Sequence, residues 1–265
     1  MKQRKNRYRF FFSQFQKYSF LFEELVKRDF KQKYKRTTLG MAWSVLSPLL
    51  TLLVMRLVFT QFFGRNTPHY TTYLFSGNLV MAYYKEATKG GMNSLMSNAR
   101  IFTKINVPKY MFLFSKNVSA LVNFGLTLCV YFIFCAFDGI TFGPHMLALV
   151  FPIVCLLAMN IGVGMILSAF YVFFRDVQYL YDVFLTLLTY LSAIFYQVDQ
   201  FSPAVQKLFL CNPVYTYIKY FRTVVIDGHL PSPAYHLLCL FYAGIFLALG
   251  CYIYKKYNRQ FLYYV

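Results

Sequence analysis

Residues 146–173 read MLALVFPIVCLLAMNIGVGMILSAFYVF, a run that contains no charged side chain. About 20 apolar residues in a helix are enough to cross the roughly 30 Å hydrocarbon core of a bilayer. Five further apolar blocks of comparable length flank this one in the chain, at approximately 40–63, 71–94, 110–137, 178–196 and 235–254. The sequence therefore predicts an all-α integral membrane protein with six transmembrane helices.

The composition agrees with a membrane protein, because only 14% of the residues are charged while 58% are apolar. Soluble chains average roughly 25% charged residues. The formal net charge of +18 would suit a nucleic-acid partner, but the basic residues gather at the N-terminus and in connections on one side, which is the positive-inside pattern. We therefore expect no nucleic-acid partner. We expect instead a multi-pass protein of the cytoplasmic (inner) membrane with both termini in the cytoplasm.

Residues 1–38 form a basic segment with apolar side chains at helical spacing. The apolar positions that show this spacing are Phe15, Tyr18, Phe22, Leu25, Val26 and Phe30. Such a segment is typical of an amphipathic helix that lies along the membrane surface. We predict two regions, a cytoplasmic basic tail with an amphipathic interface helix at 1–38 and a six-span transmembrane domain at 39–265.

The connection between the fifth and sixth predicted spans contains two helix starts. Ser202-Pro203 and Asn212-Pro213 each place a capping side chain before a proline at the first helical position, and Gly228 supplies a stop. The resulting helices, near 203–211 and 213–227, are too short to cross a membrane and too apolar for an ordinary loop. They are predicted to be two short re-entrant helices on the outer side, because a helix keeps its backbone groups paired in lipid.

The sequence indicates a protein that is not an enzyme. The four histidines lie in the predicted connections or at the start of the last span, and no pair has metal-binding spacing. No G-x-x-x-x-G-K-[ST] motif occurs. We expect no catalytic residue, no metal site and no cofactor on this chain, so ATP and Mg²⁺, if used, would bind to a partner subunit.

Charged residues within predicted spans are functional candidates by default. Arg56 lies deep in the first span and Glu86 in the second. Glu86 is expected to pair with Lys116 or Lys89, and a purely structural pair is the alternative. Arg56 either has a functional role within the first span or extends outward to the interface.

Aromatic residues are dense at the outer end of the first span and along the fifth. Phe59, Phe62, Tyr190 and Tyr196 stand out. Aromatic faces stack on the apolar faces of sugar rings, although interfacial belts and lipid contacts are the alternative explanation.

Small residues in the fourth predicted span form a separate motif. Gly162, Gly164 and Ser168 have the spacing of closely packed membrane helices.

Four stretches of the chain carry distinctive motifs. The first runs from Leu25 to Trp43 and on to Pro48, with a basic R-D-x-x-x-x-Y helix, L-G-x-x-W and a proline. The others are an N-x-x-x-x-x-K-x-x-x-P loop at Asn98–Pro108, the sequence FRDV at 174–177, and Asn212-Pro213 followed by Arg222 and Gly228. They follow one another in order over nearly the whole chain, and together they resemble the permease subunits of polysaccharide, O-antigen and teichoic-acid ABC exporters.

This resemblance implies a homodimer that binds two copies of a separate nucleotide-binding ATPase subunit. It also implies export of a polyprenyl-diphosphate-linked glycan through a channel lined by the first and fifth spans. The channel residues implied here are Arg56, Phe59, Phe62, Tyr190 and Tyr196.

Two further sets of residues are assigned through the same resemblance. The ATPase coupling residues are Glu24, Lys27, Asn98, Arg100, Phe102, Thr103 and Lys104. The lipid-headgroup residues are Arg28, Lys31, Lys33, Lys35 and Arg36, for which general attraction to anionic lipid is the alternative. The stretch YYKEA at 83–87 departs from the family, whose members usually carry aromatic residues there.

Three other functions compete with glycan export. A secondary transporter would show an inverted repeat with broken helices, and a membrane-embedded glycosyl- or acyltransferase would need a carboxylate or histidine cluster at one face. A permease of the same fold that moves a drug or a simple lipid is the nearest rival. The sequence leaves open the identity of the polymer and the number of membranes in the envelope. It also leaves open whether the ATPase carries a substrate-binding domain.

Overall fold

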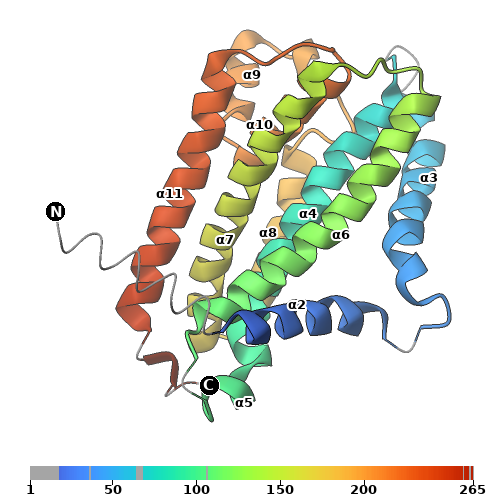
Figure 1. Cartoon of the computed structure of the whole chain (residues 1–265). Coiled ribbons are helices and arrows are strands. Elements are labelled where there is room, and N and C mark those ends of the chain that lie inside the picture. The colour runs from blue at the N-terminus through green and yellow to red at the C-terminus, as the bar shows by residue number, and fades with distance from the viewer. Residues whose placement is uncertain are drawn as a thin grey trace.

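The chain folds into a bundle of long helices with short helices at both ends (Figure 1). The computed structural model describes residues 18–35, 37–63, 68–105, 107–258, 260–262 and 264, and within these ranges it describes no side chain for Tyr34 or for residues 60–63. Regular structure in the described ranges is entirely helical, which confirms the predicted all-α class.

Ten α-helices occur in the described part of the chain, together with four 3-10 turns. In chain order they are α2 (Ser19–Tyr34), η1 (Gly40–Ala42), α3 (Trp43–Phe63), α4 (Tyr70–Ser97), α5 (Ala99–Phe102), α6 (Tyr110–Phe137), η2 (Pro144–Leu149), α7 (Val150–Phe173), α8 (Val177–Leu191), η3 (Val198–Gln200), α9 (Pro203–Phe209), α10 (Pro213–Val225), α11 (Pro233–Tyr257) and η4 (Gln260–Leu262).

Helix α7 lies at the centre of the bundle and packs against α4 and α11, while α6 covers the other side of α4. Figure 1 shows these four helices side by side, with α2 lying across their lower end and α3 standing at one edge. We call the two ends of the bundle the α2 end and the α9 end.

Four helices in the described ranges are both long enough and apolar enough to cross a membrane: Gly40–Phe59, Tyr110–Phe137, Pro144–Phe173 and Pro233–Tyr257. The chain is therefore a multi-pass helical membrane protein. The predicted spans at 71–94 and 178–196 correspond to α4 and α8. Helix α4 has 28 residues but carries Lys85, Glu86 and Lys89, and it tolerates them because neighbouring helices surround it. Helix α8 has only 15 residues.

Small residues bring the central helices into close contact, as the sequence predicted. A Cβ atom on Gly162 of α7 would lie 2.3 Å from the carbonyl carbon of Phe246 in α11. A Cβ atom on Gly91 of α4 would lie 2.8 Å from the Cα atom of Gly164 in α7. Neither position has room for a side chain, so glycine sets the distance between these helices.

The two short helices predicted between the fifth and sixth spans are present as α9 and α10. The side chain of Asn212 accepts hydrogen bonds from the backbone nitrogens of Val214 and Tyr215, which confirms it as the cap of α10. Ser202 makes no such side-chain bond at α9. Gly228 follows α10 with φ of +70°, the left-handed conformation that favours glycine.

Candidate functional site

Helix α2 is fixed to the bundle through a buried carboxylate. Asp29 Oδ1 accepts from Arg28 Nη2 at 2.8 Å and pairs with Lys116 Nζ of α6 at 2.9 Å. Its Oδ2 atom accepts from the hydroxyl of Ser115 at 3.3 Å. The Asp29 side chain is only 2% exposed, and a buried carboxylate is tolerated when such partners surround it. The surface helix is therefore held by specific ionic contacts in addition to the apolar packing of Leu25.

A second contact joins α2 to the connection between α4 and α6. Arg28 Nη2 donates to Asn98 Oδ1 at 2.7 Å, and Asn98 Nδ2 donates to the carbonyl oxygen of Ser94 at 2.8 Å. The structure thus brings together Arg28, predicted to bind a headgroup, and Asn98, predicted to contact an ATPase. Helices α2 and α5 both lie at the α2 end of the bundle (Figure 1), and this hydrogen bond joins α2 to the residue that precedes α5.

The predicted coupling residues divide into exposed and buried positions. Glu24 and Lys27 form an exposed ion pair of 3.1 Å on α2, and the exposed residues beside α5 are Arg100, Thr103 and Lys104. Asn98 and Phe102 are 1% and 5% exposed. The exposed set is available to a partner surface, whereas Asn98 and Phe102 shape the α5 turn from inside.

The predicted headgroup residues also differ in their exposure and in their existing contacts. Lys31, Lys33 and Lys35 are exposed on the last turn of α2 and beyond it. Arg28 already donates hydrogen bonds to Asp29 and Asn98. Arg36 lies outside the described residues.

The predicted partners of Glu86 were wrong. Glu86 Oε1 pairs with Lys33 Nζ at 2.9 Å, and Oε2 accepts from Asn123 Nδ2 at 2.8 Å. Lys116 pairs instead with Asp29, and Lys89 pairs with Asp182 of α8 at 2.6 Å. The prediction failed because it considered only neighbouring spans. The crossing of α2 over α6 supplies a carboxylate to Lys116 and leaves an ammonium for Glu86.

Phe59 of the first span and Tyr190 of the fifth, both predicted, each contact the ring of Phe195. The rings of Phe59 in α3 and Phe195 after α8 stack with centroids 4.3 Å apart, and Tyr190 lies 6.1 Å from Phe195. The hydroxyl of Tyr196 donates to the carbonyl oxygen of Tyr190 at 2.9 Å. Arg56 is exposed on α3, and the side chain of Phe62 is not described.

Arg222 holds the backbone that carries this aromatic group, a role that the sequence did not reveal. The helix of α8 ends at Leu191, and Ala193 has a positive φ of 49°. The buried guanidinium of Arg222 donates to the carbonyl oxygens of Ala193 at 2.9 Å and Ile194 at 3.2 Å. It also lies over the ring of Tyr73, 3.3 Å from the centroid. The available signal was an arginine in the last turn of an apolar helix that an Asn-Pro pair begins.

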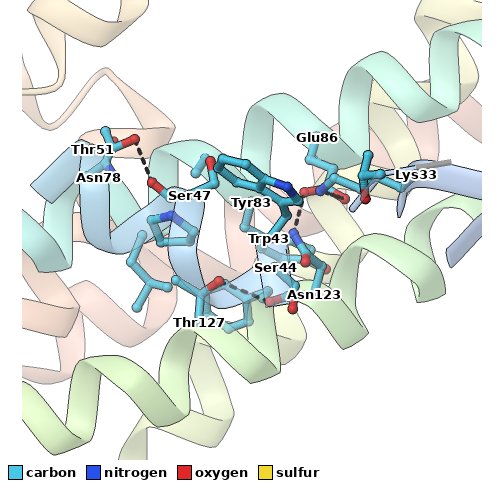
Figure 2. A pocket seen from close by; sticks show the side chains of 15 residues that line it. Lys33, Trp43, Ser44, Ser47, Thr51, Asn78, Tyr83, Glu86, Asn123 and Thr127 are labelled. Carbon is cyan, nitrogen blue, oxygen red and sulfur yellow. Dashed lines mark hydrogen bonds and ion pairs between the residues drawn. The ribbon is translucent and has the colours of Figure 1, made fainter. Parts of the chain in front are cut away.

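A cleft of about 440 Å³ opens between the end of α2, the first half of α3 and the facing sides of α4 and α6. Figure 2 shows its lining side chains converging from these four helices. The polar ones are Lys33, Thr37, Ser44, Ser47, Thr51, Asn78, Glu86, Asn123 and Thr127, and the others are Trp43, Pro48, Leu79, Ala82, Tyr83 and Phe124.

The chain matches the ABC-2 type transporter family over residues 21–226. It is similar to the O-antigen export system permease protein RfbA of Myxococcus xanthus, with 27% identity over 81% of this chain and 84% of the relative. Two proteins of the same name from Klebsiella pneumoniae are 26% and 24% identical, each over 91% of this chain and 95% of its own length.

These matches confirm the resemblance found in the sequence motifs. ABC-2 permeases work with an ATPase partner subunit and are typical of the cytoplasmic membrane. Because the family match covers more than half of the chain, this protein belongs to the ABC-2 type transporter family as a multi-pass permease subunit, a transport protein rather than an enzyme.

Proposed function

We propose that this chain is the channel-forming subunit of an ABC transporter that exports a lipid-linked polysaccharide or teichoic-acid-type glycopolymer across the cytoplasmic membrane. ATP hydrolysis on a separate subunit drives the transport. The observation that carries the substrate class is the similarity, over most of the chain, to relatives named as O-antigen export permeases.

The working assembly in this proposal is a homodimer with two ATPase subunits at the α2 end. The exposed residues of α2 and α5 contact the ATPases, and the Arg28–Asn98 hydrogen bond supports a shared response of the two elements. Movement of one element is transmitted to the other and, through the Asp29–Lys116 pair, to α6. Region 1–38 then acts as the coupling and interface region, and 39–265 as the permease domain.

The proposed membrane arrangement has six spans with both termini cytoplasmic. The spans are α3, α4, α6, α7, α11 and α8 extended by the segment 192–197. Helix α2 lies at the inner interface, where its lysines meet headgroups. Helices α9 and α10 re-enter the outer leaflet from outside. The position of α2 and of α9 at opposite ends of the bundle supports this arrangement (Figure 1).

The proposed path for the glycan runs past the aromatic group formed by Phe59, Tyr190, Phe195 and Tyr196. A chain of sugars must slide, so its contacts should be numerous and individually weak. Aromatic faces meet this need, since they contact sugar rings through apolar surface. Buried charges would hold the polymer too firmly and carry a desolvation penalty of several kcal/mol per ion.

Transport by the purified complex tests this function. The chain is reconstituted in proteoliposomes with its cognate ATPase, and the appearance of a lipid-linked glycan on the far side is followed with ATP supplied on the ATPase side. Export that depends on ATP and is lost with a hydrolysis-deficient ATPase is the expected result. Equal transport of a fluorescent phospholipid or a drug, without export of the glycan, would instead support the rival permease function.

A further inference from the structure

Glu86 belongs to the stretch YYKEA at 83–87 and lies at the wall of the cleft in Figure 2. Asn123, which donates to Glu86, follows Lys116 by seven residues along α6, a rise of about 10 Å. Because Lys116 is the residue that anchors α2, the cleft extends from the level of the surface helix into the bundle. It therefore joins the headgroup region to the protein interior.

The lining of this cleft does not suit hydrocarbon. Ten of its 15 side chains carry a hydroxyl, amide, carboxylate or ammonium group, if the phenol of Tyr83 is included. The hydroxyls of Ser44, Thr51 and Thr127 already bond to backbone carbonyl oxygens. The charged and amide groups of Lys33, Glu86 and Asn123, in contrast, would be costly to place against acyl chains. A volume of about 440 Å³ lies within the range of roughly 300–1,000 Å³ found for small-ligand sites. The cleft is suited to a polar ligand that arrives from the interface.

The chemical groups in the cleft are distributed unevenly. Lys33 comes from α2 at the surface side, and Glu86 and Asn123 lie deeper, joined to each other at 2.8 Å. Hydroxyls line the α3 side at Ser47 and Thr51. An ammonium at the entrance suits a phosphate, and a carboxylate–amide pair with neighbouring hydroxyls suits a group with several hydroxyls.

Aromatic side chains complete the site. The indole of Trp43 and the ring of Tyr83 also line the cleft. Such rings present apolar faces to the CH face of a sugar. The combination of phosphate-binding cation, hydroxyl-binding polar pair and aromatic face is met by a sugar phosphate, and a plain phospholipid headgroup would leave the inner polar pair unused.

We propose that this cleft binds the sugar–phosphate headgroup of a prenyl-linked lipid, with the phosphate at Lys33 and the first sugar at Glu86 and Asn123. This inference rests on the proposed function and adds a site for the lipid-proximal end of the substrate. When the ligand enters, Lys33 exchanges its contact with Glu86 for the phosphate. The freed Glu86 carboxylate then accepts hydrogen bonds from sugar hydroxyls.

The sequence provides a built-in reporter, because Trp43 is the single tryptophan of the chain. The full-length permease in nanodiscs is titrated with farnesyl diphosphate linked to N-acetylglucosamine while the fluorescence of Trp43 is recorded. Parallel titrations use farnesyl diphosphate without sugar and short-chain phosphatidylglycerol. We expect saturable binding of the sugar-bearing probe and roughly tenfold weaker binding of the other two, as for the loss of one charge-assisted hydrogen bond.

Three variants identify the contacts. Glu86→Gln should lower the affinity for the sugar-bearing probe about tenfold relative to the sugar-free probe, whose affinity should not fall because Lys33 no longer has to leave an ion pair. Lys33→Met should weaken both probes. Asp182→Asn is the matched control, because it removes the carboxylate partner of Lys89 without lining the cleft. Asn123→Ala serves as a second test if Glu86→Gln lowers the yield of folded protein.

Equal affinity for all three probes would mean that the cleft is a general lipid site and would overturn the inference. So would unchanged affinity in both Glu86→Gln and Asn123→Ala. Export by the reconstituted complex separates the two proposals. If the wild-type complex exports glycan and neither variant changes binding or export, only the cleft assignment fails. If the wild-type complex exports no glycan, the proposed function itself fails.

Discussion

The Nη1 atom of Arg222 in α10 donates to the carbonyl oxygen of Ala193 at 2.9 Å, across 29 residues of sequence. A second nitrogen of the same guanidinium reaches Ile194, and a third reaches the hydroxyl of Ser76. One side chain therefore satisfies backbone groups that the early end of α8 leaves without helical partners. The aromatic residues that follow, Phe195 and Tyr196, owe their position to this contact.

Substitution of Arg222 by lysine should destabilise the α9 end of the bundle. Lysine keeps the charge but cannot reproduce a planar fork of donors. Each buried carbonyl left unpaired costs about 1–3 kcal/mol, and 1 kcal/mol corresponds to roughly 2–4 °C in the melting temperature of a chain of this size. Thermal unfolding of the detergent-purified protein measures the effect.

Lys219→Met is the control for this experiment, because Lys219 is a cation on the same helix that pairs with Asp199, itself 74% exposed. An exposed ion pair contributes only about 0–1 kcal/mol. A melting temperature lowered equally by both substitutions would show that Arg222 has no special role in holding the segment 192–197.

Much of the fold could be predicted from short-range features. The apolar blocks identified the long helices, and Pro203, Asn212-Pro213 and Gly228 bounded α9 and α10, because prolines and glycines act through the local backbone. That α4 could be a span despite its charged residues was harder to establish from the sequence. Its charged residues are tolerated only because other helices surround it, and that information is tertiary.

Gly162→Ala should disrupt the packing of α7 on α11. The new methyl group would lie 2.3 Å from the backbone of Phe246, and backbone cannot move aside as a flexible side chain can. Overpacking of this kind costs about 1–3 kcal/mol. Gly125→Ala in α6 is the matched control, since nothing lies within 4 Å of its Cβ position. That substitution should be neutral or stabilising by up to about 1 kcal/mol. Equal melting temperatures for the two variants would contradict the close approach.

Photo-crosslinking should map the ATPase contact to exposed positions around α5. A benzophenone amino acid at Arg100 or Thr103, both exposed, should capture the ATPase in the purified complex. The same group at Ile133 is the control. This residue is exposed near the C-terminal end of α6, far along the helix from α5, and should not capture the ATPase. Failure of both α5 positions in an intact complex would place the coupling surface elsewhere.

The side-chain pairing of the candidate sites was beyond prediction from sequence. Phe59 and Tyr190 were identified by residue type, and the structure brings them together through Phe195. The partner of Glu86 could not be deduced, because Lys33 precedes it by 53 residues on a helix whose crossing over α6 has no local signature. The sequence showed which residue types were available for a site, but it did not show which of them the fold would bring into contact.

Tyr190→Ala should slow glycan export while leaving assembly and ATP hydrolysis intact. The side chain is 60% exposed in the single chain and lies 6.1 Å from Phe195, so its removal leaves little cavity. An aromatic contact is worth about 0.5–1.5 kcal/mol, which predicts a two- to tenfold lower export rate. Tyr179→Ala is the control, because Tyr179 is 71% exposed on the same helix but near its opposite end. Unchanged export in Tyr190→Ala, or a parallel loss in Tyr179→Ala, would show that the aromatic group does not line the path.

Tyr196→Phe tests the same path without loss of a ring, since it removes only the hydroxyl that reaches the Tyr190 carbonyl. It should keep export near the wild-type rate if the rings, rather than that hydrogen bond, contact the glycan.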